Sequence, residues 1–310
     1  MIYQAGFIIL PASVFYYKLF ITMRIIPSDQ LPINSDGSIF HLHLKPEQLA
    51  DKVVLMGDPG RVPVVAGYFD SVEFDMQSRE FRTITGMYKG KRITAISHGI
   101  GCDNLDIVMT ELDALANIDL EKRVVKEDFR QLTMVRIGTC GGLQPFAPIG
   151  SYVISEISMG MDGLIFFYEK GETISDFLLA QQFTEFTRWN EHLAAPYFIH
   201  ADKELTERIG HDMVRGITIS ASGFYGPQGR HVRLPLSNPD QNKLIEEFEY
   251  KDLKITNYEM ESSALAGMAA LMGHKATTAC LVIAGRYSGG MNTDYKGSFE
   301  GLITNVLDRI

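Results

Sequence analysis

Short apolar runs of strand length alternate with helix-period segments along most of this 310-residue chain, and this alternation restricts the fold more than any other feature. The runs are rich in β-branched residues, and several end in glycine-containing turns. The predicted strands are residues 52–56, 93–97, 133–138, 152–157, 217–221 and 277–283, and the predicted helices include residues 62–68, 103–116 and 260–272. Such alternation predicts an α/β fold with a largely parallel sheet covered by helices on both faces.

The chain reads as one domain with an N-terminal extension. No internal repeat or low-complexity linker divides residues 36–310, so we expect a single domain there and treat residues 1–35 as an extension. Residues 6–23 are apolar, but a proline and a lysine interrupt them and no small-residue cleavage site follows. Three interpretations stay open: residues 1–22 as an upstream reading artefact, an ordered or loose extension, and a membrane anchor.

Two segments have the composition of insertions. Residues 117–131 are highly charged, which predicts a solvated helix or loop. Residues 164–191 carry many aromatic side chains, which predicts helical cover over one end of the sheet.

Composition excludes several classes of function. The 29 Lys and Arg against 38 Asp and Glu give a formal net charge of −9, which disfavours nucleic-acid binding. An anionic ligand must therefore be held by local arginines. Three scattered cysteines are too few for a disulfide framework or a zinc site and indicate a reducing compartment, so we expect a cytoplasmic protein.

Two glycine-rich loops follow predicted strands, and each carries an arginine. The first holds Gly57 and Arg61, and the second holds Arg136 and Thr139. Ligands of α/β sheets gather beyond the carboxyl ends of strands, where backbone N–H groups and a guanidinium suit an oxyanion. A tight strand-to-helix turn explains either loop alone, but two of them favour an oxyanion site. Neither has the spacing of a triphosphate or dinucleotide loop.

Residues 224–230, FYGPQGR, combine an aromatic face with an amide and a guanidinium. Gln228 offers donor and acceptor atoms and Arg230 offers donors only, which matches the O2, N3–H and O4 edge of uracil beside Phe224. Arg286 follows the run 277–283 and adds a second cation. The alternative interpretation is a surface loop with a salt-bridged arginine.

Two carboxylates flank a methionine at residues 259–261. Glu261 suits the vicinal hydroxyls of a ribose, and Met260 suits its apolar face. The alternative is that these carboxylates, Glu259 included, complement the dipole of the following helix. His41 lies between apolar residues, a pattern that is most often structural or exposed. Serine, cysteine and histidine residues show no triad-like arrangement, which disfavours covalent catalysis.

Together, these segments resemble the uridine phosphorylases of the nucleoside phosphorylase superfamily from about residue 36 to residue 310. The shared motifs, in order along the chain, are FHLHL, GDPGR, SREF, HGIG, RIGTCGG, FYGPQGR and NYEMES. The last two are specific, whereas GDPGR and RIGT are shared with purine nucleoside phosphorylases. The resemblance implies one α/β domain around a central mixed, partly barrel-like sheet flanked by helices.

The resemblance also implies the site. Phosphate would be bound by Gly57, Arg61, Arg136 and Thr139, with Arg79 reaching into the site of a neighbouring subunit. The base would be bound by Phe224, Gln228 and Arg230. The ribose would be bound by Glu259, Met260 and Glu261, together with His41 from a neighbouring subunit. A monovalent cation between subunits would lie near Glu80, Ile100 and Asn104, although some relatives carry a serine where this chain has Asn104. Cys140 likewise replaces a threonine or serine of the phosphate loop.

The expected reaction is the reversible phosphorolysis of uridine to uracil and ribose 1-phosphate in pyrimidine salvage. The resemblance assigns Arg230, Gln228 and Arg286 to stabilising the departing base, with inorganic phosphate as co-substrate and no required cofactor. It implies a homodimer, or a hexamer built as a trimer of dimers, and no membrane or nucleic-acid partner. The alternatives are a purine nucleoside phosphorylase or an adenine-releasing nucleosidase of the same superfamily, and a nucleoside-binding sensor.

Overall fold

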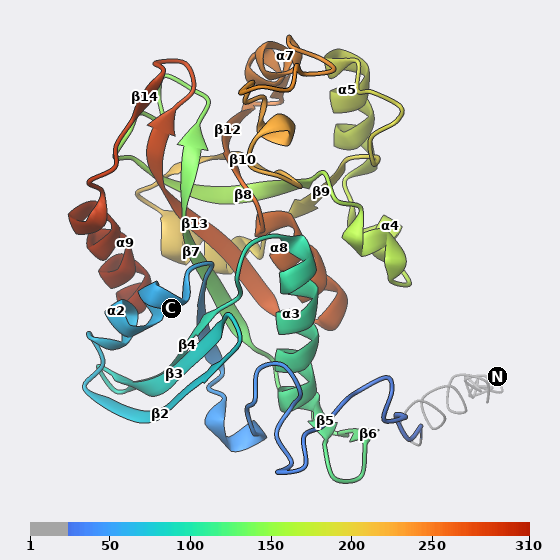
Figure 1. Ribbon diagram of the computed structural model, residues 1–310, viewed down its shortest axis with the longest axis vertical. Helices are drawn as coiled ribbons and strands as arrows, with labels where there is room; N and C mark the ends of the chain where they lie inside the picture. The colour runs from blue at the N-terminus through green and yellow to red at the C-terminus, as the bar shows by residue number, and fades with distance from the viewer. Residues whose placement is uncertain (1–23) are drawn as a thin grey trace, which may run out of the picture.

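A ring of five long strands forms the centre of the fold in the computed structural model, which describes residues 24–310. The strands pair in the order β7 (Thr133–Gly142), β13 (Lys275–Gly285), β8 (Tyr152–Gly160), β10 (Val214–Ser220) and β12 (Leu253–Glu259). β12 then pairs back onto β7, which closes the ring. Their near-continuous burial is typical of strands covered on both sides. The predicted mixed, partly barrel-like sheet is therefore confirmed (Figure 1).

An open extension continues the sheet beyond β7. β1 (Lys52–Met56) pairs in parallel with β7 and with β4 (Lys91–Ser97), after which β3 (Phe81–Tyr88) and β2 (Ser71–Ser78) follow as an antiparallel meander. The short strands β9 (Tyr197–His200), β11 (Glu249–Tyr250) and β14 (Gly290–Met291) pair antiparallel with β8, β12 and β13. The expectation of a largely parallel sheet is wrong for these outer strands. Short turns join β2 to β3, β3 to β4, β11 to β12 and β13 to β14, which antiparallel neighbours allow, whereas the longer segment 161–196 joins β8 to β9.

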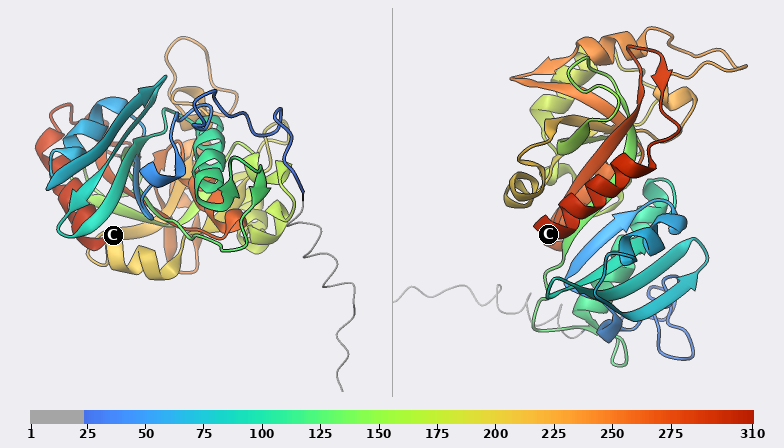
Figure 2. Two further views of the ribbon diagram at one scale, coloured as in Figure 1. Left: turned by 90° about the horizontal axis from the view of Figure 1, so that it is seen from below. Right: turned by 90° about the vertical axis from the view of Figure 1, so that its left-hand side faces the viewer.

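Helices cover both faces of the sheet. α3 (Cys102–Asn117) and α8 (Ser262–Met272) pack on one another and share a core with β1 and β7. α2 (Val62–Ala66), α6 (Lys203–Gly210) and α9 (Lys296–Arg309) bury their apolar residues in a second core (Figures 1 and 2). The predicted end of α8 is confirmed, because Gly273 forms its C-cap with a φ of 80°. Short 3₁₀ turns η1 (Pro46–Gln48), η2 (Pro59–Arg61), η3 (Leu164–Phe167) and η4 (Gly226–Gln228) complete the elements.

The two proposed insertions have different structures. The prediction of a helix or loop at 117–131 is wrong in part, because β5 (Ile118–Asp119) and β6 (Val124–Val125) form a small hairpin there. Arg123 in its turn donates to the carbonyls of Ile26, Pro27 and Leu31, which fastens the N-terminal segment to the hairpin. The helical cover predicted at 164–191 is confirmed by η3, α4 (Gly171–Ile174) and α5 (Phe177–Thr187), and α5 packs against β9 and α7 (Gln241–Glu247).

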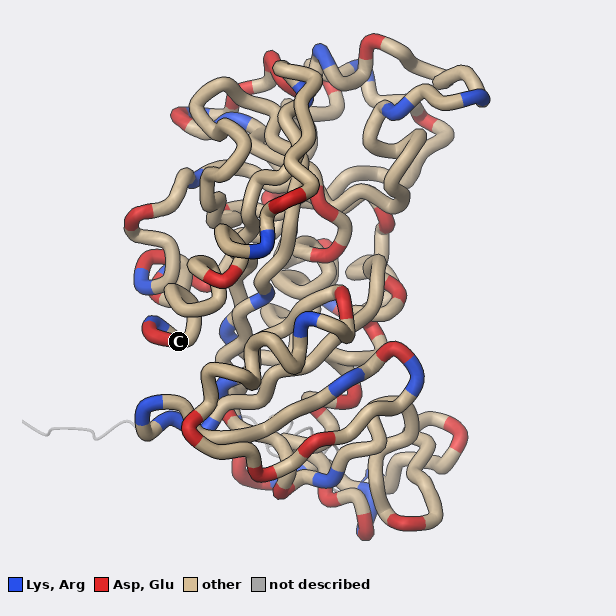
Figure 3. The backbone as a smooth tube through the Cα atoms, turned by 60° about the vertical axis from the view of Figure 1, so that its left-hand side comes forward, with Lys and Arg blue, Asp and Glu red and all other residues tan. Residues whose placement is uncertain are grey.

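The N-terminal predictions are only partly covered by the structure. Residues 1–22 lie outside the described residues. Leu31, within the proposed extension, is buried in the core that α3 and α8 share. None of the helices within residues 24–310 has the length and apolarity to cross a membrane. Over the same residues, basic and acidic positions are interspersed along the chain (Figure 3).

Candidate active site

Residues of the ring and of the open sheet, with the segments that follow their strands, line a cavity of about 630 Å³. Ten of the predicted phosphate, base and ribose residues line it: Gly57, Arg61, Arg136, Thr139, Phe224, Gln228, Arg230, Glu259, Met260 and Glu261. They come from β7, from the segments that follow β1 and β10, from the end of β12 and from the start of α8, although these lie far apart in sequence. The prediction of a loop around Thr139 is wrong, because residues 133–142 all belong to the strand β7. A second, larger cavity of about 950 Å³ lies on the other side of residues 224–230, the base loop, and only Arg230 of the ten residues lines it. The smaller cavity is therefore the candidate active site.

Arg136 lies at the buried centre of the site. Its Nη1 is 2.9 Å from a carboxylate oxygen of Glu259, its Nη2 donates to Glu261, and its Nε donates to Nε2 of His98 at 3.2 Å. Burial alone would lower the pKa of Arg136, but Glu261 and Glu259 raise it above its usual value, so the guanidinium stays charged. A Cβ at Gly138 would lie 2.7 Å from Nη1, so only glycine leaves room for the guanidinium. Arg136 thus joins the predicted phosphate loop to the predicted ribose carboxylates.

The two glutamates are fixed by backbone donors at the start of α8. Glu259 accepts from the N–H groups of Glu261 and Ser262, and Glu261 accepts from the N–H of Gly101 at 2.8 Å. These bonds agree with the alternative interpretation, in which the carboxylates complement the helix dipole. Burial and Glu259 raise the pKa of Glu261 against the opposing effect of Arg136. Because both glutamates also line the cavity, the helix start orients them toward it.

The base loop brings together an amide and two guanidinium groups. Oε1 of the buried Gln228 accepts from Nη1 of Arg230 at 2.6 Å, and its main-chain carbonyl accepts from Nη2 of Arg286 at 2.9 Å. The guanidinium carbon of Arg230 lies 3.6 Å from the ring centroid of Phe224. Burial, followed by the charge of Arg286, lowers the pKa of Arg230 to about 10, and burial lowers that of Arg286. Two partly buried cations lie close together here.

Arginines at the edge of the site have no carboxylate partners among the described residues. Arg61 donates to the hydroxyl of Tyr295 at 3.2 Å and covers the ring of Phe299, without an ion pair. Arg230 and Arg286 likewise form no ion pair within residues 24–310. In an acidic chain, unneutralised arginines around one cavity favour an anionic ligand.

Three predicted site residues do not line the cavity. Arg286 donates to the main-chain carbonyl of Gln228. Nδ1 of His41 lies 2.6 Å from Glu111, whose carboxylate also accepts from the backbone N–H of His41 and of Leu42. Arg79 has a φ of 55°, and its guanidinium carbon is 5.8 Å from the ring centroid of Phe40. His41 and Arg79 therefore gather at one edge of the chain.

The residues named for a cation lie together on the cavity wall. Nδ2 of Asn104 donates to the carbonyl of Ile100 at 3.3 Å, so an ion held there with Glu80 requires the amide oxygen to replace the nitrogen. Within residues 24–310, no three His, Cys, Asp or Glu side chains cluster as a metal site would. The cation therefore stays a prediction.

Sequence reasoning assigned no role to two residues that matter for the geometry. His98 orients Arg136 from the HGIG motif, and burial lowers its pKa well below the usual value. Tyr258, next to Glu259 on β12, lines the cavity and donates to Asn242 of α7 at 3.0 Å. Both lie beside recognised site residues, and that position was the only available signal.

The comparisons with known proteins agree with this geometry. A sequence model of the phosphorylase superfamily matches residues 51–302. Uridine phosphorylase of Thermococcus kodakarensis is 29% identical over 261 residues, which cover 84% of this chain and 82% of that protein. Guanosine phosphorylase of Halorubrum lacusprofundi is 25% identical over 258 residues, covering 82% of this chain and 88% of that protein.

A solved structure shares the fold over nearly its whole length. It is the crystal structure of a Trypanosoma brucei nucleoside phosphorylase described as showing uridine phosphorylase activity. It superposes with a TM-score of 0.82 at 30% identity and covers 90% of this chain and 98% of that one. The family match spans most of the chain, and the structural match spans its fold. The chain therefore belongs to the phosphorylase superfamily, as an enzyme that acts on a nucleoside and phosphate.

Proposed function

We propose that the protein catalyses the reversible phosphorolysis of uridine to uracil and ribose 1-phosphate. The observation that carries this proposal is the cluster of Gln228, Arg230 and Arg286 at one end of a cavity whose remainder is suited to a ribose and a phosphate. The pyrimidine specificity rests on this cluster. The uridine phosphorylase activity for which the Thermococcus and Trypanosoma relatives are named supports it.

The hydrogen bonds of Gln228 suit a uracil edge. Oε1 accepts from Nη1 of Arg230 at 2.6 Å and from Nη2 of Arg286 at 3.4 Å, and Nε2 donates to no group within residues 24–310. Nε2 is therefore available for a uracil carbonyl, and the N3–H of the base would take the place of the longer Arg286 contact on Oε1. Arg230 then supports the other carbonyl, while Phe224 offers its ring face to the base.

The two guanidinium groups favour a leaving group that departs as an anion. As the bond between C1′ and N1 breaks, its electron pair moves onto the uracil ring and its carbonyl oxygens. Arg230 and Arg286 are held close together with lowered pKa values, because each is partly buried and, for Arg230, the other charge is near. Negative charge on the base relieves that repulsion, so the transition state is stabilised more than neutral uridine.

The opposite end of the cavity supplies the nucleophile. A phosphate oxygen bonds to C1′ as the base departs, and because the base leaves as an anion stabilised by the arginines, no proton donor to it is needed. Arg61 and Thr139 of β7 hold the phosphate, and Arg136 adds charge while it is fixed by the glutamates. Glu261 accepts from the ribose hydroxyls, with Met260 against the sugar.

His41 and Arg79 complete the site of a second copy of the chain in this proposal. Both residues lie outside the chain's own cavity, at one edge of the molecule. The enzyme is accordingly a homodimer, or a hexamer built as a trimer of dimers. We further propose that it acts in the cytoplasm, which its three buried free thiols support.

A purine reaction is less well served by this geometry. A departing purine is helped by protonation of its ring, which requires a carboxylic acid beside the base. The base loop is faced instead by the guanidinium groups of Arg230 and Arg286.

An absorbance assay tests the proposal. Purified enzyme is given uridine, inosine or methylthioadenosine, with and without phosphate. Uracil release that requires phosphate and exceeds purine release is the expected result. Faster cleavage of inosine or methylthioadenosine, or cleavage that proceeds equally without phosphate, overturns it.

A further inference from the structure

The base loop is anchored from behind by one side chain of α7. Nδ2 of Asn242 donates to the main-chain carbonyl of Gln228 at 3.1 Å, and Oδ1 of the same amide accepts from the hydroxyl of Tyr258 at 3.0 Å. Asn242 does not line the active-site cavity, but both of its partners do. One amide therefore links the loop that reads the base to the strand that carries the ribose residues.

The loop backbone is shaped to receive this amide. Gly229 follows Gln228 with a φ of 69°, and a Cβ at this position would lie only 2.3 Å from Nδ2 of Asn242. Glycine therefore permits both the left-handed turn and the close approach of the amide. On its other side, the same Gln228 carbonyl accepts from Arg286 at 2.9 Å. Two donors thus fix one peptide group, which sets the direction of the Gln228 side chain.

We infer that Asn242 is a positioning residue for base recognition: it holds the Gln228 peptide so that the amide side chain meets the pyrimidine edge. This inference rests on the proposed function, because it concerns the same base subsite. Asn242 acts through the backbone of Gln228 and touches no reacting atom. A displacement of the loop by a fraction of an ångström would misalign both Gln228 and Arg230.

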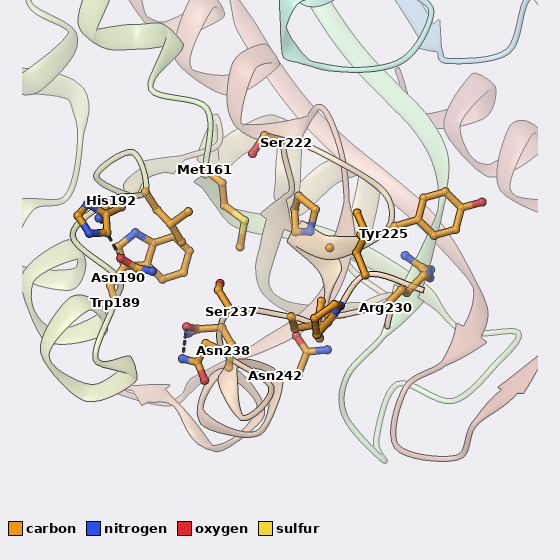
Figure 4. Close-up of a pocket in the computed structure, with 18 of the residues that line it drawn as sticks. Met161, Trp189, Asn190, His192, Ser222, Tyr225, Arg230, Ser237, Asn238 and Asn242 are labelled. Carbon is orange, nitrogen blue, oxygen red and sulfur yellow. Dashed lines mark hydrogen bonds between the residues drawn. The ribbon is translucent and has the colours of Figure 1, made fainter. Parts of the chain in front are cut away.

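Asn242 also lies on the wall of the larger cavity behind the loop (Figure 4). Trp189, Asn190 and His192 lie across this cavity from it. Asn190 accepts from the backbone N–H of His192 and, within residues 24–310, forms no hydrogen bond with residues 224–230. It offers a matched control on the same cavity.

Asn242→Asp is the informative variant. It keeps the side-chain size and an acceptor for Tyr258, but it replaces the donor to the Gln228 carbonyl with an oxygen that repels it. Steady-state rates are measured with uridine and phosphate varied separately, for Asn242→Asp, Asn242→Ala, the control Asn190→Asp and wild type, together with thermal unfolding midpoints.

The expected result is a fall in kcat/KM for uridine of about tenfold or more in both Asn242 variants, the order expected for one lost positioning hydrogen bond. The KM for phosphate should stay within about twofold of wild type. Asn190→Asp should match wild type in both. Unchanged kcat/KM for uridine in Asn242→Asp, or an equal rise in the KM of both substrates, overturns the inference. If wild type prefers another nucleoside, the proposed function fails, and the same comparison with that nucleoside still tests Asn242.

Discussion

Replacement of Arg230 by alanine should remove most of the activity while leaving the fold intact. The variant loses the donor that lies 2.6 Å from Oε1 of Gln228 and the cation that covers Phe224. One donor aimed at charge that develops in the transition state contributes about 3 kcal/mol, which corresponds to a fall in kcat/KM for uridine on the order of 100-fold. Arg230→Lys should fall between alanine and wild type, because an ammonium keeps the charge but not the planar fork.

The folding side of this prediction follows from the pKa of Arg230. Its value in the folded protein, about 10, is below the usual 12.5 because of burial and the charge of Arg286, so the folded state disfavours the charged form. Removal of the charge therefore relieves a repulsion, and the unfolding midpoint should stay at or slightly above that of wild type. A loss of activity at unchanged stability would therefore assign Arg230 to the reaction rather than to the fold.

The assay is steady-state uridine phosphorolysis paired with thermal unfolding. Arg233→Ala is the matched control, because Arg233 is an exposed arginine of the same loop that lines only the larger cavity. It should keep the kcat/KM of wild type. Wild-type kcat/KM in Arg230→Ala, or an equal loss in Arg233→Ala, refutes the reasoning.

Three further outcomes follow from the buried and shared groups. Arg136→Ala strands the carboxylates of Glu259 and Glu261, so denaturant unfolding should show a loss of about 3–5 kcal/mol; a loss below about 1 kcal/mol means that the ion pairs are not formed. His98 has a pKa well below its usual value because of burial and Arg136, so below about pH 6.5 the unfolded chain takes up a proton that the folded chain does not. Stability is therefore lost as the pH falls from about 6.5, and thermal unfolding between pH 7.5 and 5 should show a smaller loss in His98→Gln; an identical slope contradicts this assignment. A mixture of the Arg79→Ala and Glu261→Ala variants should regain activity on subunit exchange, up to about half that of wild type per hybrid dimer. If mass spectrometry confirms the exchange and no activity returns, a shared site is ruled out.

The elements that could be predicted from the sequence are those whose residues are continuously buried. β1, β4, β7 and β13 read as apolar, β-branched runs, and their predicted ranges overlap the observed strands. β2 did not stand out, because it is an edge strand with mostly exposed residues. β3 and β12 were missed although most of their residues are buried, because polar residues and a glycine interrupt their apolar runs. The 117–131 hairpin was missed for a related reason: its strands are two residues long, and tertiary contacts of Arg123 hold it rather than local propensity.

The site likewise has features that could be predicted from the sequence and features that could not. Its segments could be named because glycines and arginines lie at or near the carboxyl ends of strands, a local pattern, although the segment around Thr139 is part of β7 itself. The pairing of Arg136 with Glu261 joins residues 125 positions apart, and no spacing rule indicates it. The role of Asn242 depends on the position of α7 against β12, which only the assembled fold defines.

The reaction proposed for these residues is the transfer of a ribosyl group from uracil to phosphate. Phosphorus NMR of the enzyme with uridine and inorganic phosphate measures it directly, with uracil determined on the same samples. The proposed reaction predicts ribose 1-phosphate in a one-to-one ratio with uracil, and the formation of uridine when both products are supplied without phosphate. Free ribose in place of the sugar phosphate, or no uracil from uridine while a purine nucleoside is cleaved, would contradict it.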